Sequence, residues 1–92
     1  MKTFFTTAEG TAVVETFPGR EPGVVSIIPR VKIGESVARE LERLFGHKAR
    51  VNYDPSATFI SIEVEDIRLD EELRQIVEFL RNHPGKWWFP YY

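Results

Sequence analysis

The sequence feature that most constrains the fold is an alternating run, TFISIEVE, at Thr58–Glu65. In an extended chain, one side would carry Thr58, Ile60, Ile62 and Val64, and the other Phe59, Ser61, Glu63 and Glu65. Side chains of a β-strand point alternately to its two faces, so this period of two is typical of a half-buried strand. We therefore expect a central strand whose Ile62 side faces helices and whose Phe59 side faces away from them.

Two further strands are predicted near the N-terminus, at Lys2–Thr7 and Thr11–Phe17, which are rich in Phe, Thr and Val. Between them lies Gly10, which adopts positive φ at low cost, so the pair predicts a β-hairpin. The next residues, PGREPG at 18–23, hold two prolines and two glycines, which interrupt a strand ladder. We expect a loop there that separates the hairpin from the rest of the chain.

A helix is predicted over residues 35–45, after a β-branched strand at 24–28. Its apolar residues recur at helical spacing, and the predicted buried positions are Val37, Ala38, Leu41, Leu44 and Phe45. Gly46 is expected to end this helix as a left-handed cap. A strand at 50–53 and a type I turn at Asp54–Ala57 should then lead into the alternating run.

A second helix is predicted from Asp70 onward, because aspartate is a favourable N-cap and Glu71 and Glu72 suit the positive end of the helix dipole. Its expected buried residues are Leu73, Ile76, Val77 and Leu80. Asn82–Gly85 contains a proline and a glycine that should end this helix.

The order of these elements predicts one α+β domain of 92 residues. From residue 24 to residue 92 the pattern is strand, helix, strand, strand, helix and a final strand, which matches a ferredoxin-like βαββαβ core in a two-layer sandwich. The hairpin at 1–17 and the loop at 18–23 precede this core. The last strand should lie at a sheet edge, where Pro90 is tolerated.

Composition excludes several classes of function. The chain has no cysteine, so it has no disulfide framework and no thiolate metal site, which favours a reducing compartment. It shows neither a signal peptide nor a long apolar run, so we expect a small soluble cytoplasmic protein with no membrane partner. A net charge of −2 gives no long-range attraction for phosphate backbones, which makes nucleic acid an unfavoured partner.

No catalytic, cofactor or metal site is predicted. His47 and His83 both fall in loops and lack a second ligand at metal spacing, so surface histidines are the better interpretation. The acidic residues between Glu63 and Glu72 lack the glycine register of a calcium loop and are expected to be solvated. The serines and glycines match neither the nucleophile-elbow motif nor the phosphate-loop motif. We therefore expect a protein that is not an enzyme.

The aromatic C-terminus is the strongest functional signal. Trp and Tyr are common anchors of protein interfaces, and an extended tail would have two apolar faces of which one layer of helices covers only one. The alternative is that the N-terminal hairpin covers this tail or that the tail folds back on the core. The predicted partner-binding residues are Trp87, Trp88, Phe89, Tyr91, Tyr92 and Phe59.

These observations favour a non-enzymatic protein-interaction module: a small subunit, adaptor or inhibitor that docks on a larger protein through its sheet edge and aromatic tail. The alternative is a dimeric regulatory domain that pairs with a second copy through its sheet and holds a small ligand. A third and weaker hypothesis is nucleic-acid binding. That function would use the basic residues Arg20, Arg30, Lys32, Lys48 and Arg50.

Overall fold

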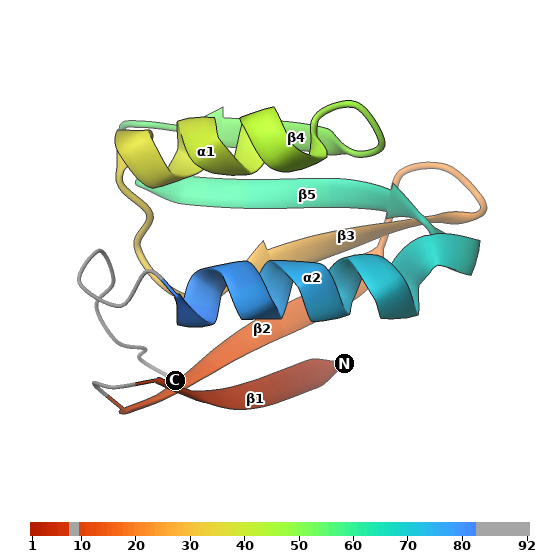
Figure 1. The fold of residues 1–92 in the computed structure, drawn as a ribbon. Helices are drawn as coiled ribbons and strands as arrows, with labels where there is room; N and C mark the ends of the chain where they lie inside the picture. Colours follow the sequence, from red (N-terminus) through yellow and green to blue (C-terminus); the bar gives the residue numbers. More distant parts are fainter. Residues whose placement is uncertain (8–9, 83–92) are drawn as a thin grey trace.

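A computed structural model describes residues 1–7 and 10–82 of the chain. The elements follow in the order β1 (Lys2–Thr7), β2 (Gly10–Pro18), β3 (Val24–Pro29), α1 (Glu35–Phe45), β4 (Arg50–Asp54), β5 (Phe59–Glu65), the short 3₁₀ turn η1 (Asp66–Arg68) and α2 (Leu69–Arg81). The five strands form one antiparallel sheet in the order β1-β2-β3-β5-β4 (Figure 1). The predicted α+β class is confirmed.

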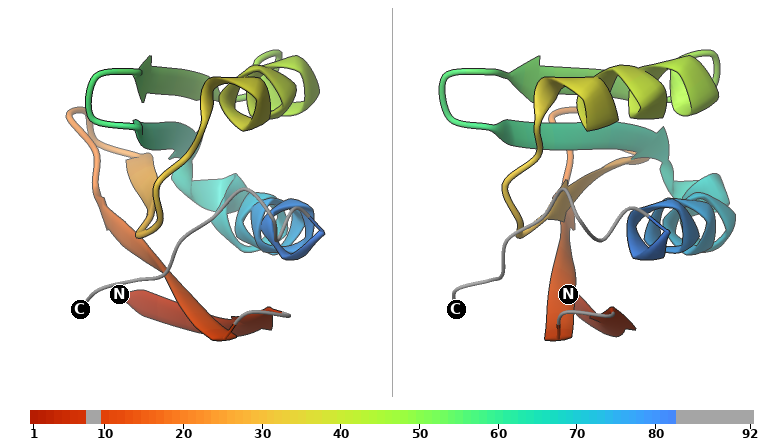
Figure 2. Two further views of the ribbon diagram at one scale, coloured as in Figure 1. Left: turned by 90° about the vertical axis from the view of Figure 1, so that its left-hand side faces the viewer. Right: turned by 60° about the vertical axis from the view of Figure 1, so that its left-hand side comes forward.

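Both helices lie on the same side of the sheet (Figures 1 and 2), with α1 in contact with β4, and α2 in contact with β1 and β5. We call the opposite side, which neither helix covers, the open face. Neither helix in the described part of the chain is long and apolar enough to cross a membrane.

The alternating run is the central strand β5, and its predicted register is confirmed. Ile60, Ile62 and Val64 are each at most 2% exposed and point toward the helices. Because residues opposite each other in a sheet point to the same face, the pair Ile27↔Ile62 extends this buried row onto β3, where half-buried Val25 lies opposite Val64. The core formed in this way also includes Val14, Ile33, Val37, Ala38, Leu41, Phe45, Ile76, Phe79 and Leu80.

The order of elements does not establish the predicted ferredoxin-like βαββαβ core. In the described residues it is βββαββα, and β3 is paired on both sides, with β2 and with β5. The N-terminal hairpin therefore belongs to the same sheet, in which β2 lies between β1 and β3. The predicted strand at 87–92 lies outside the described residues.

The segment at 18–23 is a hairpin connection between β2 and β3 and not a separating loop. Pro18 still pairs with Val25 at the end of both strands, and the Gly19 N–H donates to the Val24 carbonyl at 2.8 Å. Gly23 has φ of 84°, a conformation that glycine adopts without the steric cost of a Cβ atom. The proline and glycine content of this segment shapes a turn between paired strands.

Three predicted details of α1 and β5 are wrong. Gly46 has φ of −61° and ψ of −18°, so α1 ends without a left-handed cap, and the Gly46 N–H continues the helical bonding to Glu42. Leu44 is 37% exposed because it falls just outside the arc of the helix that Val37, Leu41 and their buried neighbours share. Thr58 has φ of 49° and precedes β5, which begins one residue later.

The predicted start of α2 is also wrong. The helix begins at Leu69, after η1, and its N-cap position is Arg68, with no side-chain cap bond. Asp70 lies within the first turn, where its charge still suits the helix dipole. Of the predicted buried residues, Ile76 and Leu80 are buried, whereas Leu73 and Val77 are half-buried. Phe79, which was not predicted, is also buried.

Candidate functional site

The open face carries three exposed phenylalanines, one on each of three strands. Phe4 on β1 is 58% exposed, Phe17 on β2 is 40% exposed and Phe59 on β5 is 41% exposed. Each alternates with a buried, helix-facing residue: Phe5, Thr16 and Ile60 respectively. The sheet therefore holds these three aromatic side chains on the surface that the helices do not cover.

The strand register sets the distances between these three residues. Phe17 pairs with Ser26, which pairs with Glu63, and Phe59 lies four residues further along β5. Spacings of about 4.8 Å between strands and 3.4 Å along them put the Cα atoms of Phe17 and Phe59 roughly 17 Å apart. Phe4 pairs with Val13, so the same spacings put it roughly 14 Å from Phe17.

Beside Phe17 and Phe59, toward β4, the open face has a shallow polar groove of about 340 Å³. Its lining residues are Pro18, Gly19, Arg20, Ser26, Arg50, Asn52, Ser61 and Glu63. The serine hydroxyls and the Asn52 amide supply hydrogen-bond donors and acceptors. The residues at 18–20, in the β2–β3 connection, form one side of the groove. A Cβ atom at Gly19 would lie 2.7 Å from the Val24 carbonyl oxygen, so this close approach of loop and strand requires glycine.

A second groove of about 530 Å³ continues from the polar groove at the end of the sheet, and the two share Arg20, Arg50 and Glu63. Its cationic residues are Arg20, Lys48 and Arg50, and its acidic residues are Glu21, Glu63 and Glu65. The exposed ring of His47, in the loop after α1, also lines it. Opposite charges are therefore balanced along this groove.

The structure divides the five basic residues of the nucleic-acid hypothesis. Arg20, Lys48 and Arg50 meet at the second groove. Arg30 instead forms an ion pair with Glu15 at 3.0 Å, and exposed Lys32 lies between β3 and α1. Alternating acidic and basic groups offer a phosphate backbone no continuous positive track.

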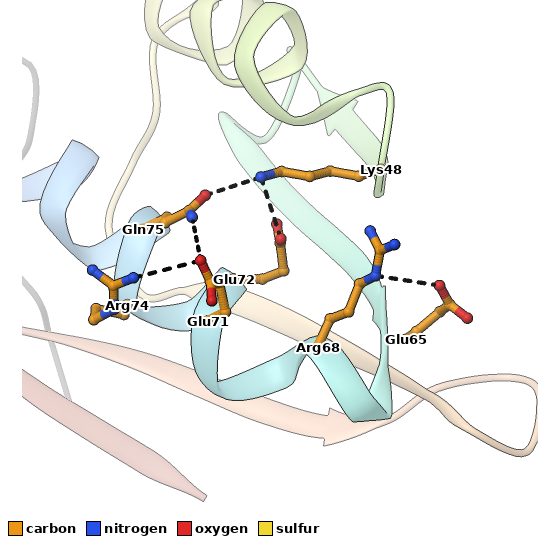
Figure 3. A network of polar contacts seen from close by, with 7 residues as sticks. All are labelled: Lys48, Glu65, Arg68, Glu71, Glu72, Arg74 and Gln75. Carbon is orange, nitrogen blue, oxygen red and sulfur yellow. Dashed lines mark hydrogen bonds and ion pairs between the residues drawn. The ribbon is translucent and has the colours of Figure 1, made fainter.

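One acidic residue predicted to be solvated is buried. Glu72 is 3% exposed, and one of its carboxylate oxygens lies 3.4 Å from the Lys48 ammonium, which also donates to the Gln75 side chain at 3.0 Å (Figure 3). The other oxygen, Oε2, has no hydrogen-bond partner in the described structure. Lys48 also lies 5.5 Å from the centroid of the Phe45 ring. These contacts join the loop after α1 to the first turn of α2.

The turn between β4 and β5 is built on Asp54. Its Oδ1 atom accepts hydrogen bonds from the Ser56 hydroxyl at 2.7 Å and from the Ser56 N–H at 3.0 Å. These two bonds favour the charged carboxylate and hold the pKa of Asp54 below its ordinary value. Asp54 therefore stays ionised at neutral pH, at the exposed end of the edge strand.

Of the predicted partner-binding residues, only Phe59 falls in the described part of the chain, and it lies on the open face as expected. Trp87, Trp88, Phe89, Tyr91 and Tyr92 lie outside the described residues, as does His83. Within residues 1–7 and 10–82, no group of three or more His, Cys, Asp or Glu side chains is placed to hold a metal ion.

Sequence reasoning missed Phe4 and Phe17 as members of this surface. Alternation within β1 and β2 was the available signal, because each strand has a phenylalanine one position from a buried residue. No pattern in the sequence indicated the two grooves. Their residues come from the β2–β3 connection, β4, β5 and the loop after α1, and only the sheet order brings these segments together.

The chain matches no protein-family model, no curated protein and no solved structure.

Proposed function

We propose that this chain is a non-enzymatic protein-interaction module that docks on a larger protein through the open face of its sheet. The observation that carries this proposal is the exposure of Phe4, Phe17 and Phe59 on the face opposite both helices. Aromatic side chains bury a large area at a small cost in conformational entropy, which makes them effective interface anchors.

The dimensions of this surface support a protein partner. A standard interface covers about 800 Å² on each partner, which is roughly 30 Å across. The three phenylalanines, separated by roughly 14–17 Å, fit inside such an area together with the polar groove at its side. Separate aromatic anchors next to a polar, hydrogen-bonding groove suit a protein surface better than a single small apolar ligand.

Affinity capture from host-cell extract, with mass spectrometry, tests this proposal. The wild-type chain is compared with a variant that combines Phe4→Ser, Phe17→Ser and Phe59→Ser. The matched control replaces two exposed apolar residues outside the open face, Leu44 and Ile67, by serine. We expect the wild type and the control to retain the same protein, and the triple variant to lose it while circular dichroism shows that it is folded. Equal retention by all three chains would contradict docking through the open face.

A second candidate function is the binding of a small polar ligand in the two connected grooves. The supporting observation is that Arg20 and Arg50, from segments distant in sequence, both border the serine and asparagine side chains of the polar groove. Screening polar metabolites by thermal shift tests this function. A ligand that stabilises the wild type and not an Arg20→Ala variant would support it.

A further inference from the structure

Strand β4 lies at one edge of the sheet that the described strands form. It pairs with β5 on one side, and no other described strand pairs with it on the other (Figure 1). An edge strand presents unpaired N–H and C=O groups that can extend the sheet onto another chain. The other edge strand, β1, contains the basic residue Lys2 but no acidic residue in its six positions.

The sequence of β4, RVNYD, is antisymmetric in charge about its central residue, Asn52. Arg50 lies two positions before Asn52 and Asp54 two positions after it, so all three side chains lie on the open face. If β4 pairs antiparallel with β4 of a second copy and Asn52 lies opposite Asn52, then each Arg50 lies opposite an Asp54. Cβ atoms of directly opposed residues are about 4.5–5.5 Å apart, close enough for two ion pairs. A shift of two residues in either direction loses both Arg50–Asp54 pairs.

The charged groups are available for this pairing. Both hydrogen bonds from Ser56 to Asp54 use the Oδ1 atom, and the residue is exposed at the end of the strand. Among the described residues Arg50 has one ion-pair contact, a long one of 3.9 Å to Glu63, and its side chain is 72% exposed. Each group therefore reaches a second copy without breaking a close ion pair.

The helix side of β4 is also compatible with a second copy. In the same register Val51 lies opposite Tyr53, so the helix side of the joined strands is apolar. A groove of about 510 Å³ lies between β4 and α1, and its walls include Ala38, Val51 and Tyr53. The Tyr53 hydroxyl donates to the Ile33 carbonyl at 2.6 Å, which fixes the ring beside this groove.

From this self-complementarity we propose that two copies of the chain associate by antiparallel pairing of their β4 strands, with Asn52 at the two-fold axis. The two sheets then form one continuous sheet with both pairs of helices on the same side. This association joins the β4 edges, whereas the proposed docking covers the open face; the two share Arg50 and Asn52 at their border, and the pairing does not rest on the proposed docking. Strand pairing over five residues is a small contact, so the dimer dissociates on dilution.

Charge reversal tests the register. Arg50→Glu places two acidic pairs across the axis, and Asp54→Lys places two basic pairs there. We expect sedimentation equilibrium to show a concentration-dependent dimer of twice 10.7 kDa for the wild type. Each variant alone should be monomeric, and their equimolar mixture should again form a dimer. Lys2→Glu, at the other edge, is the matched control and should associate as the wild type does. A monomeric wild type at millimolar concentration, or a mixture that stays monomeric, would overturn the proposal.

Disulfide trapping gives a second measurement, which does not depend on the turn that Asp54 stabilises. Asn52→Cys introduces a single cysteine into a chain that has none. Opposed residues in an antiparallel pair have Cα atoms about 4.5–5.5 Å apart, within the range of a disulfide. We expect this variant to cross-link on the order of ten-fold faster than Lys2→Cys at equal concentration. Equal rates for the two variants would contradict pairing at β4.

Discussion

Replacing Lys48 by Met should destabilise the protein, because it leaves the Glu72 carboxylate buried without its cation. Glu72 is 3% exposed and Lys48 23% exposed, with 3.4 Å between their charged atoms. Breaking a fully buried ion pair costs about 3–5 kcal/mol, and the partial exposure of Lys48 lowers our expectation to about 2–3 kcal/mol. Methionine keeps an unbranched apolar side chain beside Phe45, so most of the packing is retained while the ion pair with Glu72 and the hydrogen bond to Gln75 are lost.

Urea unfolding followed by circular dichroism measures this free energy. The double variant Lys48→Met, Glu72→Met removes both charges and should recover stability to within about 1 kcal/mol of the wild type. Arg74→Met breaks an exposed pair with Glu71 and should cost less than about 0.5 kcal/mol. If Lys48→Met costs no more than Arg74→Met, Glu72 does not depend on Lys48 and the reasoning is wrong.

Four other regions give further predictions. Ile62→Ala should lower the free energy of unfolding by about 2–5 kcal/mol, as a truncation in the core, and a loss below 0.5 kcal/mol in urea unfolding would reject the register of β5. Ser56→Ala should raise the pKa of Asp54 toward its ordinary value in an NMR titration. The pKa of Asp54 is lower in the folded state than in the unfolded state, so the stability that the carboxylate adds is present at neutral pH and is lost as the pH falls through the folded pKa. An unchanged pKa in the variant would show that Ser56 does not cause the lowered pKa of Asp54. Gly23→Ala should cost about 1–2 kcal/mol because φ is positive there, and a neutral effect in the same assay would contradict this. Deleting Trp87–Tyr92 should abolish association with the captured partner while circular dichroism shows a folded chain, whereas unfolding of the truncated chain would reject a binding role for the tail.

The sequence alone was sufficient to predict local structure with strong periodicity. Alternation in β5 identified both its faces, and helical spacing identified α1 and α2, because burial on one side imposes these periods. Errors fell at element ends, such as Gly46 and Asp70, where a cap depends on local backbone geometry that residue type does not determine. Leu44 lies at the margin of its apolar stripe, where spacing does not separate buried from exposed positions.

Local sequence patterns could not predict that β2 pairs with β3, nor that the three exposed phenylalanines share one surface. PGREPG has the composition of a linker, and the same residues also form a hairpin turn in which Gly23 adopts positive φ. Phe17 and Phe59 share a surface only because the sheet order places β3 between β2 and β5. Glu72 resembles its solvated acidic neighbours in sequence, and its burial follows from how α2 packs against the loop that holds Lys48.

Hydroxyl-radical footprinting of the chain, free and bound to its captured partner, tests the central claim most directly. Phenylalanine side chains react readily when exposed, and Phe4, Phe17 and Phe59 are each at least 40% exposed in the free chain. We expect labelling of all three to fall in the complex while labelling of Leu44, on the helix side, is unchanged. Protection of Leu44 with undiminished labelling of the three phenylalanines would show that the partner binds elsewhere.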